Sequence, residues 1–187
     1  MRRIQITEWT HNMVTSLMSH PALCIDATAG TGRDTEFLCD LCGEKGKVIG
    51  MDILPEAIEM TRERLMSRDI LNRAALVLDS HENMDRYAKE ETVDLIMFNL
   101  GYLPGGDHTL STKAETTIKA IEKGLRLLKR DGIMSLMIYS GGDSGFEEKE
   151  QVLAYVKALS AKDYTVIVEA FYNKPNHPPI PVLILKH

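Results

Sequence analysis

The sequence predicts an α/β fold in which a mostly parallel, doubly wound sheet is covered by helices on both faces. Two observations and one general rule lead to this prediction. Short apolar runs alternate with longer segments of helical periodicity along nearly the whole of the 187 residues. Parallel strands need a crossover segment between them, and a helix usually forms it. The last two apolar runs have no helical segment between them, which predicts a closing hairpin whose last strand is antiparallel.

The strands are expected at the apolar runs and the helices at the periodic segments between them. Pro55 suits a first helical turn, and Gly43 follows the first expected helix as a stop signal. Seven strands are expected, over residues 22–26, 47–51, 74–78, 93–98, 133–139, 166–171 and 182–185. Helices are expected over residues 33–42, 55–68 and 147–159. A further helix is indicated by an apolar stripe at helical spacing, formed by Ala114, Ile118, Ile121, Leu125 and Leu128.

The composition is that of an ordinary globular protein, with 44% hydrophobic and 26% charged residues. A single domain over residues 1–187 is expected, because this length suffices for one core. No run approaches the roughly 20 apolar residues of a membrane span, and no signal peptide is visible, so we expect a cytoplasmic protein. The net charge of -5 disfavours a surface coated for nucleic-acid binding but leaves room for a local basic face.

Cys39 and Cys42 have the spacing of a redox pair or of half a zinc site. No second half with metal-ligand spacing accompanies them, so no metal site is predicted. Redox pairs usually lie at the start of a helix, where the dipole lowers the thiol pKa, whereas these cysteines fall late in an expected helix. With Cys24 they make three cysteines, an odd count that is typical of a reducing compartment. We interpret the pair as ordinary packing residues.

A glycine turn follows the first expected strand, which ends at Asp26. In doubly wound sheets the ligand lies beyond the carboxyl ends of the strands, near the topological switch point. Gly30 and Gly32 allow the backbone to turn tightly and to approach a ligand closely. The alternative is a tight turn between strand and helix that binds nothing, since two glycines at this spacing are a weak signal.

Polar residues also follow the next three strands. Asp52 lies 22 residues after Gly30, where a carboxylate can accept hydrogen bonds from both ribose hydroxyls of a nucleoside. Asp79, Ser80 and His81 follow the third strand, where side chains flank an adenine ring. Asn99 ends the fourth strand, at the mouth of the expected site. Each could be a cap or turn residue by itself. The occurrence of polar residues at the ends of four successive strands favours a nucleotide-like cofactor.

Two cofactors compete for this loop. A nicotinamide dinucleotide requires a third glycine three residues after the second, and Thr35 stands there instead. Asp26, just before the turn, suits the positively charged methionine end of S-adenosylmethionine (SAM). The loop therefore favours SAM.

Three motifs carry a resemblance to a known family. They are Asp-Ala-Thr-Ala-Gly-Thr-Gly-Arg-Asp-Thr at 26–35, Asp-Ser-His-Glu-Asn at 79–83 and Asn-Leu-Gly-Tyr-Leu-Pro-Gly-Gly at 99–106. Together they resemble the small "putative rRNA methylase" family, which includes bacterial enzymes that methylate 5-aminomethyl-2-thiouridine at the wobble position of tRNA. The resemblance runs essentially end to end and includes Phe171-Tyr172-Asn173 and Pro178-Pro179.

The resemblance implies a Rossmann-like class I SAM-dependent methyltransferase with the anticodon stem-loop of tRNA as its partner. It implies that Thr31, Arg33 and Asp34 line the SAM loop, that Asp52 binds the ribose, and that Ser80 and His81 lie beside the adenine. The sequence departs from the family pattern in two places. Arg33 stands where a smaller polar residue is common, and residues 139–142 read Tyr-Ser-Gly-Gly where family members often carry Gly-His.

The segment that starts at Asn99 resembles the Asn-Pro-Pro-Tyr loop of amino-group methyltransferases. By this resemblance the side-chain oxygen of Asn99 and the carbonyl of Leu100 accept hydrogen bonds from the amine, and Tyr102 stacks on the base. Asp107 or His108 could remove the extra proton, although a solvated loop is the favoured interpretation of both. Methylation of ribosomal RNA, methylation of a small-molecule amine and a non-catalytic SAM-binding module remain as alternatives.

The surface that meets RNA is harder to predict. A basic stripe on the helix before the fifth strand could be an RNA track, but glutamates four residues before two of its members indicate ordinary surface ion pairs. The stripe consists of Lys119, Lys123, Arg126 and Arg130, and the glutamates are Glu115 and Glu122. Lys113 and residues 173–177 are better candidates. Residues 141–145 are expected to form a mobile lid, and a homodimer would supply further contacts.

Overall fold

The computed structural model describes residues 4–101, 112–139 and 142–187, the first four residues of the last range as backbone only. The helices are α1 (Ile6–Leu17), α2 (Arg33–Cys42), α3 (Pro55–Ser67), α4 (Ala114–Leu127) and α5 (Gly142–Lys157), with short 3-10 helices η1 (Leu71–Arg73) and η2 (His81–Arg86). The strands are β1 (Leu23–Asp26), β2 (Lys47–Asp52), β3 (Ala74–Leu78), β4 (Val93–Leu100), β5 (Leu128–Ile138), β6 (Tyr164–Val168) and β7 (Ile180–Lys186).

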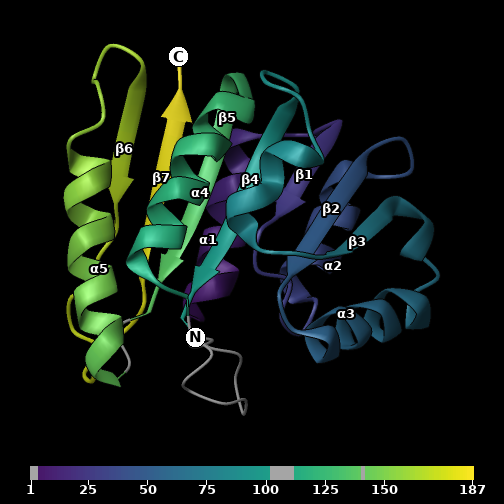
Figure 1. Cartoon of the computed structure of the whole chain (residues 1–187), viewed down its shortest axis with the longest axis horizontal. Coiled ribbons are helices and arrows are strands. Elements are labelled where there is room, and N and C mark those ends of the chain that lie inside the picture. Colours follow the sequence, from purple (N-terminus) through teal and green to yellow (C-terminus); the bar gives the residue numbers. More distant parts are fainter. Residues whose placement is uncertain (1–3, 102–111, 140–141) are drawn as a thin grey trace.

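All seven strands form one sheet in the order β3-β2-β1-β4-β5-β7-β6. Neighbours from β3 to β5 pair in parallel, whereas β7 is antiparallel to both β5 and β6. The helices α4 and α5 lie in front of this sheet and α1 and α2 behind it (Figure 1). The predicted fold class is therefore confirmed. Strand order reverses between β1 and β4, so the carboxyl ends of these two strands form the switch point at which such folds bind ligands.

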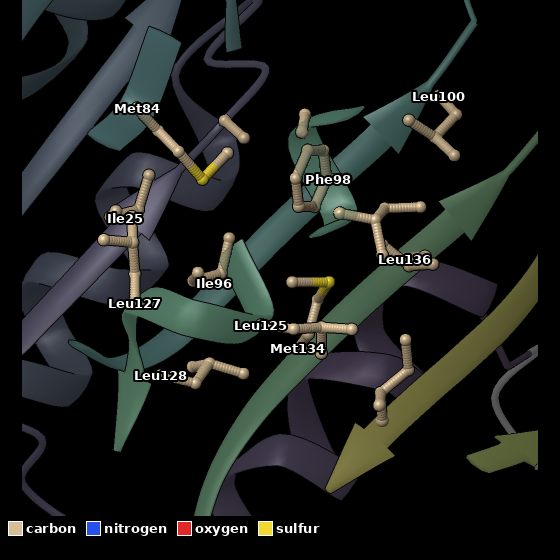
Figure 2. Close-up of a cluster of buried hydrophobic side chains, with 14 of the residues drawn as sticks. Ile25, Met84, Ile96, Phe98, Leu100, Leu125, Leu127, Leu128, Met134 and Leu136 are labelled. Carbon is tan, nitrogen blue, oxygen red and sulfur yellow. The ribbon is translucent and has the colours of Figure 1, made fainter. Parts of the chain in front are cut away.

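The main core lies between β4, β5 and α4. Phe98 and Leu100 point into it from β4, together with residues of the neighbouring elements (Figure 2). The intervening Asn99 must then face the opposite side of the sheet, because successive side chains of a strand alternate. Met97 belongs accordingly to the second core on the α2 side. The alternation along β4 thus presents Asn99 toward α2, near the end of a strand in which only Asp94 and Asn99 are not fully buried.

Several predictions about element boundaries are wrong, and the fifth strand begins at Leu128 and not at Ile133. Leu128 does not extend the apolar stripe of α4, because it pairs with Val93 as the first residue of β5. Residues 142–145 were expected in a lid loop but form the first turn of α5. The strand β6 ends at Val168 and not at Phe171. The helix α1 was not predicted at all, since only Thr10 and Val14 are fully buried on it.

The three cysteines are buried and free. Cys42 approaches Cys24, with 3.4 Å between the two sulfur atoms. This agrees with the interpretation of the cysteines as packing residues. Within the described ranges, no helix is long and apolar enough to cross a membrane.

Candidate active site

The end of β1 places a buried carboxylate beneath the glycine turn. Asp26 has no exposed surface. One of its oxygens accepts a hydrogen bond of 2.5 Å from Thr35 Oγ1, and the other accepts one of 3.2 Å from the amide of Thr28. Burial, together with the nearby charge of Asp34, raises the pKa of Asp26 to about 7. A cation bound beside this carboxylate would stabilise its ionised form.

The two glycines of the turn both have positive φ, 52° for Gly30 and 76° for Gly32, which is the left-handed region that favours glycine. A Cβ atom on Gly32 would lie 2.8 Å from Cα of Thr61, a backbone atom of α3. Gly32 is therefore required for the close approach of α3 as well as for the turn. This packing role was not foreseen.

Asp52 ties the turn to the end of β2. Its Oδ2 accepts a hydrogen bond of 2.9 Å from the amide of Gly30, and its Oδ1 accepts one of 3.0 Å from the amide of Leu54. Each carboxylate oxygen has a second lone pair, so these bonds leave room for ribose hydroxyls. The structure thus adds a loop-ordering role to the predicted binding role.

The segment after β3 is also held in place by hydrogen bonds among its own residues. Asp79 accepts hydrogen bonds of 2.8 Å from Asn83 Nδ2, Tyr87 Oη and the amide of Ser80. The bonds from the Asn83 and Tyr87 side chains hold the pKa of Asp79 below its ordinary value. Ser80 caps η2 through the amide of Glu82.

His81, the first residue of η2, packs edge-on against the ring of Phe98 with 6.0 Å between ring centroids. Burial lowers the pKa of His81 to about 4, so the ring is neutral at physiological pH. Within the part of the chain that the structure describes, its Nε2 has no hydrogen-bond partner. A buried polar atom of this kind is what a ligand with a complementary group can satisfy.

The end of β4 is connected to α2 and α1 by a chain of side chains. Asn99 Nδ2 donates a hydrogen bond of 2.6 Å to Asp34 Oδ2, and His11 Nε2 lies 2.7 Å from Asp34 Oδ1. The backbone amide of Asn99 donates to Thr28 Oγ1 at 2.7 Å. The structure therefore brings the predicted residues Asn99 and Asp34 together, and it adds His11 and Thr28, which sequence reasoning missed.

Tyr102, Asp107 and His108 lie outside the described residues, so their predicted roles stay predictions. The two positions that flank this segment are fixed. The amide of Thr112 donates a hydrogen bond of 3.0 Å to the carbonyl of Gly101. The carbonyl of Leu100, predicted to accept a bond from the substrate amine, already accepts one of 3.1 Å from the amide of Tyr139. Only its second lone pair could serve a substrate.

A buried glutamate anchors the start of α4. Glu148 on α5 is 3% exposed and accepts hydrogen bonds from two hydroxyl groups, 2.8 Å from Thr112 Oγ1 and 2.7 Å from Thr117 Oγ1. The chain that returns from beyond Gly101 is thus fastened to α5. No local pattern in the sequence indicates this contact, because the two partners of Glu148 lie more than 30 residues earlier.

Two further residues predicted to line the SAM loop, Thr31 and Arg33, lie next to Gly32. The backbone carbonyl of Thr31 accepts a hydrogen bond of 2.7 Å from Arg64 Nε, and Arg64 also pairs with Glu36 at 2.9 Å. Arg33 is exposed at the start of α2. These contacts show how α3 holds the loop in place through Arg64.

The predicted basic stripe is divided between two elements, because Arg130 lies on β5 and not on α4, and the two lysines of the stripe form contacts within the protein. Lys119 pairs with Glu115 at 2.8 Å, and Lys123 Nζ donates to the carbonyl of Glu82 at 2.7 Å and to Asp85 at 3.0 Å. The interpretation of this face as a surface with ordinary ion pairs is confirmed for Lys119.

The segment between β6 and β7 carries exposed aromatic and basic groups. Phe171 packs edge-on against Trp9 with 6.5 Å between ring centroids, and Lys174 Nζ lies 4.9 Å from the centroid of Phe171. Tyr172 is fully exposed. Because Ile138 pairs with Ile180, this segment lies at the same edge of the sheet as the carboxyl end of β5.

Comparisons with known proteins agree with this geometry. The family model described as "Putative rRNA methylase" matches residues 48–185. A chloroplastic tRNA (mnm(5)s(2)U34)-methyltransferase of Arabidopsis thaliana is 33% identical over 186 residues, which cover 94% of this chain and 68% of the relative. A ribosomal RNA small subunit methyltransferase H of Petrotoga mobilis is 31% identical over 80 residues, which cover 41% of this chain and 27% of that protein.

Solved structures are similar over the whole chain. A Clostridium thermocellum protein described as an rRNA methylase is 42% identical, with a TM-score of 0.95 and 100% coverage of both chains. A Streptococcus mutans methyltransferase in complex with SAH is 34% identical, with a TM-score of 0.88 and 100% coverage of both. The chain therefore belongs to the family described as "Putative rRNA methylase", a methyltransferase family with the class I fold.

Proposed function

We propose that this protein is a SAM-dependent RNA methyltransferase that methylates the aminomethyl group of 5-aminomethyl-2-thiouridine at the tRNA wobble position. One observation carries the proposal: the hydrogen bond of 2.6 Å from Asn99 Nδ2 to Asp34 at the switch point of the sheet. Because Nδ2 of Asn99 is hydrogen-bonded to Asp34, its Oδ1 is available to a ligand. An amide oxygen can accept a hydrogen bond from the amine that receives the methyl group. The Arabidopsis relative, whose name specifies this nucleoside, supports the choice of substrate.

The residues at the strand ends fit SAM. The buried carboxylate of Asp26 and the turn with Gly30 would hold the positively charged methionine end. Asp52 has lone pairs left for the ribose hydroxyls, and the buried Nε2 of His81 needs a partner that an adenine ring can supply. The S. mutans structure with SAH supports this cofactor. When bound, SAM supplies an electrophilic methyl group, so the protein must align the acceptor and exclude water.

Asn99 performs the alignment in this proposal. Its Oδ1 accepts an N–H of the neutral amine, which directs the nitrogen lone pair toward the methyl carbon. Transfer would form the N–C bond while the methyl–sulfur bond of SAM breaks, SAH would leave as the neutral thioether, and the product amine would carry one proton more than a neutral secondary amine. Asp107 or His108 would accept that proton or pass it to solvent. Tyr102 would stack on the unpaired base, as aromatic side chains do in RNA recognition.

The test is to incubate the protein with isotope-labelled SAM and, separately, with tRNA and ribosomal RNA from cells that lack this gene. Digestion to nucleosides and mass spectrometry would locate the label. We expect label in 5-methylaminomethyl-2-thiouridine from tRNA. Label only in ribosomal RNA would overturn the choice of acceptor but keep the cofactor. No label in either RNA, with SAM binding demonstrated, would favour a small-molecule amine.

Asn99→Ala tests the central residue. The variant should lose methyl transfer and keep its SAM affinity, because Asn99 is assigned to the acceptor and not to the cofactor. Calorimetric titration with SAM and the nucleoside assay measure the two properties. A loss of SAM affinity as large as the loss of transfer would instead make Asn99 a cofactor residue.

A further inference from the structure

We infer that His11 and Asp34 are positioning residues that fix the orientation of the Asn99 side-chain amide. The inference rests on the proposed function, in which Asn99 Oδ1 meets the acceptor amine. Its evidence is the continuous contact His11–Asp34–Asn99, which joins α1, α2 and β4 at the switch point.

The chemistry of the pair Asp34 and Asn99 selects one orientation of the amide. A carboxylate offers only acceptors, so the amide group that faces Asp34 Oδ2 at 2.6 Å must be the donor Nδ2. Rotating the amide by a half turn would bring two oxygen acceptors together. Oδ1 of Asn99 is therefore turned away from Asp34. Without the carboxylate, the two orientations would differ much less in energy.

His11 fixes the position of the Asp34 carboxylate. Its Nε2 lies 2.7 Å from Asp34 Oδ1, so this nitrogen carries the hydrogen and donates. The imidazole ring stacks on Phe37, with 3.9 Å between centroids and 4° between planes. Phe37 and Asp34 lie three residues apart on α2 and hence on one face of that helix. The ring of His11 is thus held by stacking at its face and by the hydrogen bond at its edge.

The chain of contacts is largely shielded from water. The side chains of His11 and Asp34 are 23% and 10% exposed. Beside them lies a cavity of about 10 Å³, lined by Thr10, Ser135 and other residues of α1, β4 and β5, which is room for about one water molecule. Hydrogen bonds to a carboxylate are strong in such an environment. The contacts can therefore hold a defined amide orientation before a substrate binds.

The test compares two substitutions of His11 that separate its two contacts. His11→Phe keeps an aromatic ring to stack on Phe37 but lacks the donor. His11→Gln keeps a donor at nearly the same position and lacks the ring. We expect kcat for tRNA methylation to fall about tenfold in His11→Phe and to be largely rescued in His11→Gln, with the SAM Kd and the KM for tRNA unchanged. Asp34→Ala should lower kcat about a hundredfold.

Thr15→Ala on α1 and Asp40→Asn on α2 are matched controls at exposed positions, and both should leave kcat unchanged. A fall in SAM affinity as large as the fall in kcat would overturn the inference, because His11 would then act through the cofactor site. Equal kcat values for His11→Phe and His11→Gln would also overturn it, since the donor would have no role.

A second measurement does not depend on the reaction. In ¹⁵N-labelled protein, the side-chain NH₂ resonances of Asn99, assigned through their loss in Asn99→Ala, should shift and exchange faster with water in Asp34→Ala and His11→Phe. Unchanged resonances would refute the positioning role even if the enzyme methylates tRNA. Changed resonances in a protein that methylates no RNA would sustain the positioning role and reject the proposed function.

Discussion

Replacing Asp26 by asparagine should change how the stability of the ligand-free protein depends on pH. Burial raises the pKa of Asp26 from 3.8 to about 7 in the folded protein. The folded state therefore holds this proton more tightly than the unfolded chain does. The resulting stability is fully present below pH 3.8 and is lost as the pH rises through 7. An asparagine side chain at this position carries no titratable proton, so the Asp26→Asn variant escapes this loss.

The magnitude follows from the two pKa values. Between pH 5 and pH 8.5, a group with a folded pKa of about 7 and an unfolded value of 3.8 reduces the free energy of unfolding by about 3 kcal/mol. The side-chain oxygen of asparagine can still accept from Thr35 or from the amide of Thr28. We therefore expect Asp26→Asn to be close to the wild type in stability at pH 5 and about 3 kcal/mol more stable at pH 8.5.

Urea unfolding of both proteins at a series of pH values, without SAM, measures this difference. Taking the difference between variant and wild type cancels the titration of all other groups that the substitution leaves unaltered. Asp131→Asn is the matched control, because Asp131 is exposed and its φ of 62° is one that asparagine adopts readily. A difference for Asp26→Asn that stays constant within about 0.5 kcal/mol from pH 5 to 8.5 would refute the reasoning.

Two further predictions concern the elements around the site. Glu148→Ala should lower the free energy of unfolding by about 1–3 kcal/mol, because it leaves the buried hydroxyl of Thr117 without its acceptor. Urea unfolding measures this, and Glu148→Gln should lose less because it keeps one acceptor; equal losses would contradict the explanation. Under the proposed function, Tyr172→Ala should raise the KM for tRNA about tenfold through lost stacking and leave stability unchanged, because Tyr172 is fully exposed. Met66→Ala, at another exposed apolar side chain, is the control, and an unchanged KM in Tyr172→Ala would remove this segment from the RNA surface.

Much of the fold could be predicted because it depends on local pattern. Buried strands read as short apolar runs, and the residue that follows each parallel strand must lie at the ligand-binding edge. Asp26, Asp52 and Asn99 were found in this way. Leu128 shows the limit of the method. It stands at helical spacing after Leu125, but pairing with Val93 takes it into β5, and no local pattern reports a long-range strand pairing.

The contacts within the site could not be predicted for a related reason. The sequence indicated that Asp34 lies in the glycine loop, but the rotation of α2 about its axis decides what its carboxylate meets. His11 lies on a helix whose apolar face is too narrow to be recognised from periodicity, with Thr10 and Val14 its only fully buried residues. Its pairing with Asp34 spans 23 residues. Because the helix was not recognised, nothing in the local sequence indicated that His11 contacts the site.

The acidic residues at the switch point are better understood together than singly. Three carboxylates lie close together here: Asp26 at the end of β1, Asp34 on α2 and Asp52 at the end of β2. The negative charges of Asp34 and Asp52 raise the pKa of Asp26 beyond what burial alone would do. Such a cluster destabilises the ligand-free protein. A cationic ligand relieves the repulsion, whereas a neutral one does not. SAM carries a positive sulfonium that SAH has lost, so the same repulsion that weakens the ligand-free fold would favour binding of the methyl donor over retention of the spent product.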